Sequence, residues 1–329
     1  MNRDMMAAFE LFQPTTVNDA LELLERYEDK GWVYAGGKDS LDWFKDRVKK
    51  PGAVVDISGI EELRGIKKTS DGLEIGALIT LTELENNSIV KTDYPILAQA
   101  AGRVASPQIR HAATIGGNIS QDTRCWYYRY GLPCYRAGGN TCYADTPSAM
   151  NREHCLFEAD RCVAVTPSDT APVFVAYDAK MVIQNSDGVK TVSAEEFFIG
   201  PDVDITRMTV LKPGDILTKI ILPKQWANSR AYFEKVADRQ TWDFALVNIA
   251  VAMIVKGGKI DKARVACGGV QCTPRRLSGV EDLIIGEALG SELEELAGSV
   301  ASRGAKTLNY NHFKISLMEN LVKRAIRYA

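Results

Sequence analysis

The chain contains no apolar stretch as long as the roughly 18 residues that a membrane-spanning helix requires. Its first ten residues also lack the apolar segment and the cleavage site of a secretory signal peptide. Both absences predict a cytoplasmic protein. Export of an assembled complex would depend on a signal carried by a partner chain.

An excess of one charge is also missing, because 40 basic side chains are balanced by 42 acidic ones, for a net charge of −2. This balance argues against nucleic acid or an acidic membrane surface as a partner. With 329 residues, the chain is long enough for about two domains.

Closely spaced pairs are absent from the main group of cysteines. Five of the seven cysteines lie in Thr123–Val163, separated by 8, 7, 12 and 6 residues, so none forms the C-x₂₋₄-C knuckle of zinc ribbons and fingers. The clustered, odd number also differs from the even cysteine sets of short secreted disulfide scaffolds. In a reducing compartment, such a cluster indicates a metal site rather than cross-links.

Three interpretations of this cysteine group remain open from spacing alone. An iron–sulfur cluster needs four thiolates and tolerates irregular loop spacing, because the inorganic core organises the loop. An irregular zinc site and a set of unligated thiols are the alternatives. Cys267 and Cys272 lie outside the group and are expected to be small buried residues.

Short strands and helices are predicted to alternate up to about Pro223. The expected strands are Phe9–Pro14 (ending in a proline turn), Gly31–Ala35, Ala53–Ile57, Leu73–Ala77, Ala171–Asp178, Met181–Gln184 and Ile216–Leu222. The expected helices are Thr15–Tyr27, Leu41–Lys49, a helix starting near Thr82 with Glu85 at the capping-box position, and Tyr94–Val104.

The pattern changes after Pro223. Arg230–Val236, Ala245–Val255 and Ala263–Cys267 are predicted to pair as strands, the last two through a Gly-Gly turn. Leu277–Arg303 and His312–Tyr328 are predicted helices. We therefore expect an α+β protein with a first domain over residues 1–224, carrying the cysteine-rich insertion 123–163, and a smaller α+β domain over 225–329.

Two glycine pairs lie in predicted turns: Ala35–Ser40, which follows a predicted strand and precedes a predicted helix, and Thr114–Asn118. Backbone N–H groups exposed by such turns suit a phosphate or pyrophosphate, although either turn is also compatible with a simple connection or a bulge. Neither has the glycine spacing of a dinucleotide fingerprint or a P-loop. Two such turns acting together would clamp one extended ligand.

Several segments, in this order along the chain, resemble the FAD-binding medium subunit of the molybdenum hydroxylases. They are Ala35–Leu41, Ala113–Ile119, Pro167–Pro172, Phe233–Arg239 and Phe244–Leu246. That family includes xanthine dehydrogenase, aldehyde oxidoreductase and carbon monoxide dehydrogenase. The resemblance implies a vanillyl-alcohol-oxidase-type (PCMH) FAD-binding domain followed by the C-terminal domain of the carbon monoxide dehydrogenase flavoprotein.

The resemblance also implies site residues. The FAD pyrophosphate would lie on the first turn, formed by Val33, Tyr34, Ala35, Gly36, Gly37, Lys38, Asp39 and Ser40. The other implied FAD residues are Val104, Thr114, Gly117, Asn118, Asp169, Leu217 and Lys235. Asp169 would bind the flavin or its ribityl chain, and Lys235 beside the isoalloxazine would favour an anionic reduced flavin. No catalytic residue is expected on this chain.

The inserted cysteines resemble a sub-group that carries an extra [4Fe–4S] cluster, including the 4-hydroxybenzoyl-CoA reductase beta subunit and certain bacterial aldehyde oxidoreductase flavin subunits. The latter pattern implies Cys125, Cys134, Cys142 and Cys162 as ligands and Cys155 as the spare. The CoA-reductase pattern leaves open an exchange of Cys134 for Cys155.

The implied function is electron transfer within a heterotrimer. A large molybdopterin subunit would act on the substrate, a small subunit would carry two [2Fe–2S] clusters, and electrons would pass through this chain to an external acceptor. A reductive aryl-CoA complex, with reversed flow, is the first alternative. A zinc-binding interaction protein without flavin is the second.

Overall fold

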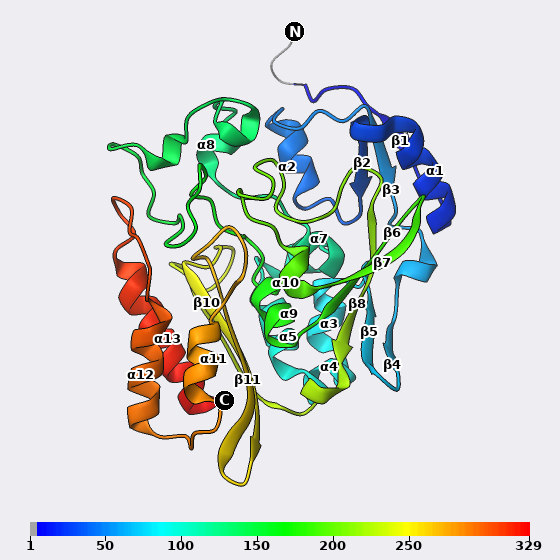
Figure 1. Ribbon diagram of the computed structural model, residues 1–329. Helices are drawn as coiled ribbons and strands as arrows, with labels where there is room; N and C mark the ends of the chain where they lie inside the picture. Colours follow the sequence, from blue (N-terminus) through cyan, green and yellow to red (C-terminus); the bar gives the residue numbers. More distant parts are fainter. Residues whose placement is uncertain (1–4) are drawn as a thin grey trace.

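The computed structural model describes residues 5–329, which are organised around three sheets (Figure 1). A parallel sheet has the order β1 (Glu10–Phe12), β3 (Ala53–Asp56), β2 (Gly31–Tyr34). An antiparallel sheet has the order β4 (Ile66–Lys68), β5 (Gly72–Gly76), β8 (Ile216–Pro223), β6 (Lys180–Asn185), β7 (Gly188–Ser193). The third, also antiparallel, has the order β12 (Arg275–Arg276), β11 (Lys259–Gly268), β10 (Val247–Lys256), β9 (Arg230–Val236).

The α-helices lie around and between these sheets. In chain order they are α1 (Val17–Tyr27), α2 (Ser40–Lys45), α3 (Leu81–Asn86), α4 (Ser88–Asp93), α5 (Pro95–Gly102), α6 (Pro107–Arg110), α7 (Ile115–Ile119), α8 (Trp126–Arg129), α9 (Ala171–Ala176), α10 (Ala194–Phe197), α11 (Ser278–Ile284), α12 (Ser291–Ala301) and α13 (Phe313–Tyr328). Within residues 5–329, none of these helices is long and apolar enough to cross a membrane.

Strand β10 packs against both halves of the chain and joins them. Its alternating residues point to opposite sides of the sheet. Ala250 and Ala252 pack into the core that contains α5, α9 and the five-stranded sheet. Ile249, Val251 and Met253 pack against α11, α12 and α13. Because both faces are buried, the strand reads in the sequence as one continuous apolar run.

The helix α1 forms as its pattern predicts. Thr16 caps it by accepting a hydrogen bond from the Asp19 N–H at 3.1 Å, and the apolar stripe of Val17, Leu21 and Leu24 is buried on the parallel sheet. Most other predicted strands are also present, within one or two residues. The expected α+β fold is confirmed.

Three predicted elements were wrong. Ala171–Asp178 was expected to be a strand but forms α9, which is buried on every side and therefore has no polar face to reveal its helical period. The expected capping box at Thr82 and Glu85 lies two residues earlier, at Thr80 and Glu83. Leu277–Arg303 forms two helices, α11 and α12, rather than one.

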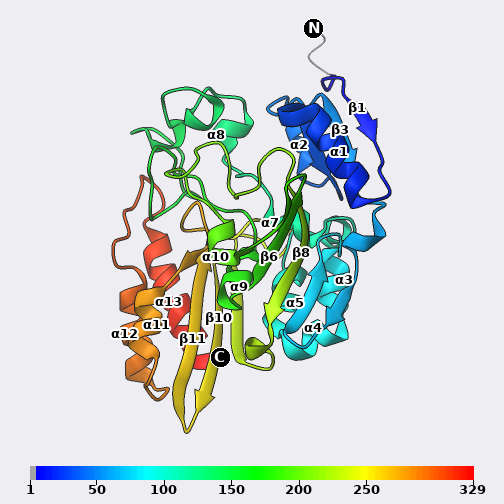
Figure 2. The same cartoon turned by 45° about the vertical axis from the view of Figure 1, so that its right-hand side comes forward.

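The cysteine-rich insertion is mostly irregular and lies between the first glycine turn and the C-terminal domain (Figures 1 and 2). Its one α-helix is α8. Its far end hydrogen-bonds with the C-terminal domain, where the N–H groups of Leu156 and Phe157 donate to the Val270 carbonyl at 2.8 and 3.2 Å. Both domains therefore determine the path of the insertion.

Candidate functional site: a clamp, a second cavity and a cysteine cavity

The two glycine turns meet at one cavity, which we call the clamp cavity. It is lined by most of the residues expected to bind FAD: Val33, Ala35, Gly36, Gly37, Lys38, Asp39, Ser40, Thr114, Gly117, Asn118 and Leu217. The sequence reasoning did not identify several further lining residues, among them Ile57, Leu78, Gln121 and Asp215. These residues come from strand ends and connecting loops, for which no local motif exists.

The close approach of the two turns requires glycine. A Cβ atom on Gly36 would lie 1.8 Å from the carbonyl oxygen of Ala112, just before the second turn. Gly37 has a φ of +67°, a conformation that L side chains rarely adopt. The first glycine pair therefore does more than connect a strand to a helix, since it lets the two backbones meet.

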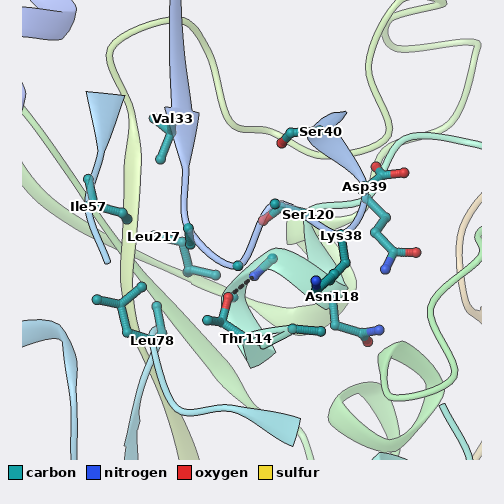
Figure 3. A pocket seen from close by; sticks show the side chains of 18 of the residues that line it. Val33, Lys38, Asp39, Ser40, Ile57, Leu78, Thr114, Asn118, Ser120 and Leu217 are labelled. Atoms are coloured by element: carbon teal, nitrogen blue, oxygen red, sulfur yellow. Dashed lines mark hydrogen bonds between the residues drawn. The ribbon is translucent and has the colours of Figure 1, made fainter. Parts of the chain in front are cut away.

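The clamp cavity is apolar at one end and polar at the other (Figure 3). Val33, Ile57, Leu78 and Leu217 gather on one side of the view, and Lys38, Asn118 and Ser120 on the other. The hydroxyl of Thr114 accepts a hydrogen bond from the Gly117 N–H at 3.1 Å, which holds the second turn in place. Such a lining suits a ligand with both an apolar ring and charged groups.

Asn118 connects the clamp cavity to the Ser-Asp segment. Its side-chain oxygen accepts hydrogen bonds from the hydroxyls of Ser168 and Thr170, each at 2.7 Å. All three side chains are buried. The residue between the two hydroxyls is Asp169, so the second glycine turn and Asp169 form one rigid unit.

Asp169 and Lys235 form a buried ion pair, with Lys235 Nζ 2.6 Å from Asp169 Oδ2. The amide of Asn248 donates to the other carboxylate oxygen at 3.0 Å, and Lys235 also donates to the Arg103 carbonyl at 3.0 Å. Burial raises the pKa of Asp169, and the ammonium of Lys235 opposes that shift. Asp169 thus compensates the charge of Lys235.

Asp169 and Lys235 line different spaces. Asp169 lines a second cavity of about 480 Å³, whereas Lys235 lines a groove beside α5 and β9. Val104 is buried in the core, and Tyr34 lies beside Gly37. Among the residues expected to bind FAD, those of the glycine turns are therefore brought together with Leu217, and Asp169 faces the adjoining cavity.

The second cavity lies between the insertion and the loop that precedes β10. The insertion contributes Arg124, Cys125, Trp126 and His154, and the loop contributes Asp238, Arg239 and residues 242–246. Arg124 stacks over the ring of Phe244 at 4.8 Å. Trp126 and Trp242 are about half exposed on its wall. This lining is aromatic and polar, which suits a planar polar ring system.

The four cysteines expected to be ligands line one further cavity. These are Cys125, Cys134, Cys142 and Cys162, whereas Cys155 is not among its lining residues. Within residues 5–329, no three His, Cys, Asp or Glu side chains are close enough together to hold a single metal ion. A zinc ion needs its four sulfur atoms at about 2.3 Å, but a cluster core is larger and accepts more widely spaced thiolates.

The thiols of this cavity differ in their protonation. Burial raises the pKa of Cys125 to about 12 and also raises the pKa of Cys142, and it raises the pKa of Cys155, which lies outside the cavity, to about 12. The pKa of Cys162 is lowered, chiefly by a hydrogen bond with Cys272 and also by the guanidinium of Arg136. All seven cysteines are free thiols. Cys162 is thus the cysteine most readily present as a thiolate.

Side chains from both domains hold the insertion. Arg124 pairs with Asp39 of the first glycine turn at 2.6 Å. On the other side, the buried ammonium of Lys314 donates to the carbonyls of Glu153, His154 and Gly269 at 2.9, 3.0 and 2.7 Å. Sequence reasoning missed Lys314, because nothing in an amphipathic helix marks a lysine as buried.

Known families account for nearly the whole chain. Residues 7–225 match the family described as "FAD binding domain in molybdopterin dehydrogenase", and residues 231–329 match "CO dehydrogenase flavoprotein C-terminal domain". The chain belongs to the FAD-binding subunits of the molybdenum hydroxylases. FAD binding in this family argues against a zinc-binding interaction protein without flavin.

Individual members of the family cover most of the chain. The carbon monoxide dehydrogenase medium chain of Hydrogenophaga pseudoflava is 28% identical over 325 residues, covering 98% of this chain and 96% of its own length. The aldehyde oxidoreductase FAD-binding subunit PaoB of Escherichia coli K12 is 32% identical over 281 residues, covering 84% of this chain and 86% of its own.

The fold is that of the same family. A solved structure of the carbon monoxide dehydrogenase from Hydrogenophaga pseudoflava superposes with a TM-score of 0.78 and 27% identity, covering 99% of this chain and 98% of that one. The expected FAD-binding domain and C-terminal domain are therefore confirmed. The chain is a subunit of an FAD-dependent oxidoreductase.

Proposed function

We propose that this chain carries FAD and a [4Fe–4S] cluster, and passes electrons between the [2Fe–2S] clusters of a partner and an external acceptor. The observation that carries this proposal is the position of Cys125, which lines both the cysteine cavity and the second cavity. A cluster in the first space and a flavin ring in the second would share this one residue as a wall.

The clamp cavity and the second cavity together would accommodate an extended FAD. The pyrophosphate would lie on the glycine turns, and the isoalloxazine would extend past Asn118 toward Asp169 and the aromatic lining of the second cavity. FAD, when bound, supplies the one- and two-electron redox chemistry. This chain's own contribution would be to hold the flavin rigidly, through Asn118 and the Asp169–Lys235 pair, and to exclude water.

The cysteine cavity fits a cluster by its donors. Four thiols line it, and the guanidinium of Arg136 lowers the pKa of Cys162 toward the thiolate form that metal coordination requires. Tyr128 and Tyr143 line the same space and would shield a cluster from water. We assign Cys125, Cys134, Cys142 and Cys162 as its ligands.

Partners follow from the relatives. Several relatives are medium or FAD-binding subunits, as is the carbon monoxide dehydrogenase medium chain. We propose that this chain likewise assembles with a large molybdopterin subunit and a small [2Fe–2S] subunit. An aldehyde- or xanthine-dehydrogenase-like complex is preferred to the reductive aryl-CoA alternative, because the relative with 32% identity is an aldehyde oxidoreductase subunit.

Anaerobic purification of the native complex, with flavin, iron and sulfide analysis, tests the proposal. We expect about one FAD and about eight iron atoms per complex, about four on this chain and four in the two [2Fe–2S] clusters of the small subunit, with two further subunits co-purifying. A complex with zinc on this chain, or with only the iron and acid-labile sulfide of the two [2Fe–2S] clusters, would refute the [4Fe–4S] cluster. A chain that purifies alone without loss of activity would refute the complex.

A further inference from the structure

A buried histidine touches one of the proposed cluster ligands. Nε2 of His154 lies 3.4 Å from Sγ of Cys125, within the range of an N–H···S hydrogen bond. The His154 side chain is 5% exposed, and its ring lies beside that of Tyr127. His154 is one of only three histidines in the chain, and nothing in its sequence context distinguishes it.

The C-terminal domain fixes the position of this histidine. The carbonyl of His154 accepts hydrogen bonds from Lys314 Nζ at 3.0 Å and from Asn311 Nδ2 at 3.2 Å, and both donor side chains are fully buried. The His154 N–H donates to the Asn151 carbonyl at 3.1 Å. The backbone of His154 is therefore held on both sides of the residue, which limits where the ring can point.

The imidazole lies on a specific side of Cys125. Cys125 lines both the cysteine cavity and the second cavity, but His154 lines only the second. His154 therefore contacts the sulfur from the side where the flavin would lie. The other ring nitrogen, Nδ1, is buried and has no hydrogen-bond partner among residues 5–329.

We propose that His154 is a positioning residue that donates an N–H···S hydrogen bond to the cluster ligand Cys125 and thereby raises the reduction potential of the cluster. This inference rests on the proposed [4Fe–4S] cluster. A ligating thiolate has no proton to donate, so Nε2 must carry the proton and Nδ1 is left as the acceptor. Reduction adds negative charge to the cluster, so the hydrogen bond stabilises the reduced state more than the oxidised state.

The test is a redox titration of the cluster in the intact complex, followed by electron paramagnetic resonance, with iron counted per chain. We expect His154→Ala to shift the midpoint potential to a more negative value. At the wild-type midpoint, the ratio of oxidised to reduced cluster should rise roughly fivefold, the size expected for loss of one ordinary hydrogen bond. His154→Gln retains a side-chain N–H donor and should restore part of the shift.

The matched control is His312→Ala, because His312 is exposed. The midpoint potential of the cluster in His312→Ala should equal that of the wild type. If His154→Ala retains its iron but titrates at the wild-type potential, the inference is wrong and the proposed function stands. If His154→Ala loses its cluster, the test compares His154→Gln, which keeps a donor, with His154→Leu, which has none. A His154→Gln variant that keeps its cluster but titrates at or below the potential of His154→Leu overturns the inference. A wild-type complex that holds only the iron of its [2Fe–2S] clusters refutes the [4Fe–4S] cluster of the proposed function itself.

Discussion

The ammonium nitrogen of Lys235 lies 2.6 Å from the carboxylate of Asp169, although the two residues are 66 positions apart and belong to different domains. Both side chains are almost fully buried, at 4% and 3% exposure. Removing one partner of such a pair leaves an uncompensated charge in the protein interior. The pair therefore couples the FAD-binding domain to the C-terminal domain beside the second cavity.

We expect Lys235→Met to lower the free energy of unfolding by about 3–5 kcal/mol, because Asp169 would be buried without its counter-charge. The double variant Asp169→Asn/Lys235→Met should lose less unfolding free energy than the sum of the losses of the two single variants. Denaturant unfolding measures both. Lys219→Met is the control, because Lys219 pairs with Glu74 at a half-exposed site and should cost at most about 1 kcal/mol. Equal losses of unfolding free energy for Lys235→Met and Lys219→Met would contradict the buried ion pair of Asp169 and Lys235.

Gly36→Ala should reduce FAD binding. The added methyl group would collide with the Ala112 carbonyl and push the two glycine turns apart, at a cost of about 1–3 kcal/mol in stability. The measurement is FAD bound per chain after dialysis, together with the unfolding midpoint. Gly59→Ala is the matched control, since a Cβ on Gly59 meets nothing within 4 Å. A Gly36→Ala chain that retains its full flavin content would show that the turns are not the clamp.

Cys134 and Cys155 should respond differently to removal. Cys134 lines the cysteine cavity and Cys155 does not, so Cys134→Ala should lose iron and sulfide whereas Cys155→Ala should retain about four iron atoms per chain. Iron analysis and the cluster absorbance of the purified complex distinguish them. The opposite result would exchange the two residues in the ligand set.

Lys314 should make stability depend on pH. Burial lowers its pKa from 10.5 to about 7, so between these two values the unfolded chain binds more protons than the folded chain. The free energy of unfolding should therefore rise with pH through this window. In Lys314→Met the rise should be shallower, by up to about 1.4 kcal/mol per pH unit.

The control for this prediction is Lys306→Met, which removes an exposed lysine from the preceding loop and should leave the slope unchanged. The three carbonyls around Lys314 favour the ammonium and act against burial. Parallel pH profiles for the wild type and Lys314→Met would mean that the carbonyls prevail and the amine stays charged in the folded chain.

Local patterns in the sequence were sufficient for much of the fold. The stripe Val17, Leu21 and Leu24 predicted α1, and the run Ala245–Val255 predicted β10, because period and length are local properties. The failures are equally instructive. The helix α9 was predicted as a strand because all its faces are buried, and the strand β7 was missed because most of its residues are exposed. Neither element therefore shows a hydrophobic period.

The sequence by itself determined the ingredients of the site: two glycine turns, a Ser-Asp segment and a group of cysteines, each recognisable because its residues are neighbours in the chain. Only the tertiary structure decided how these ingredients meet. It placed Gly36 against Ala112, paired Asp169 with Lys235, and set His154 against Cys125. These contacts join residues that are 29 to 76 positions apart, and they depend on tertiary packing that no local pattern encodes.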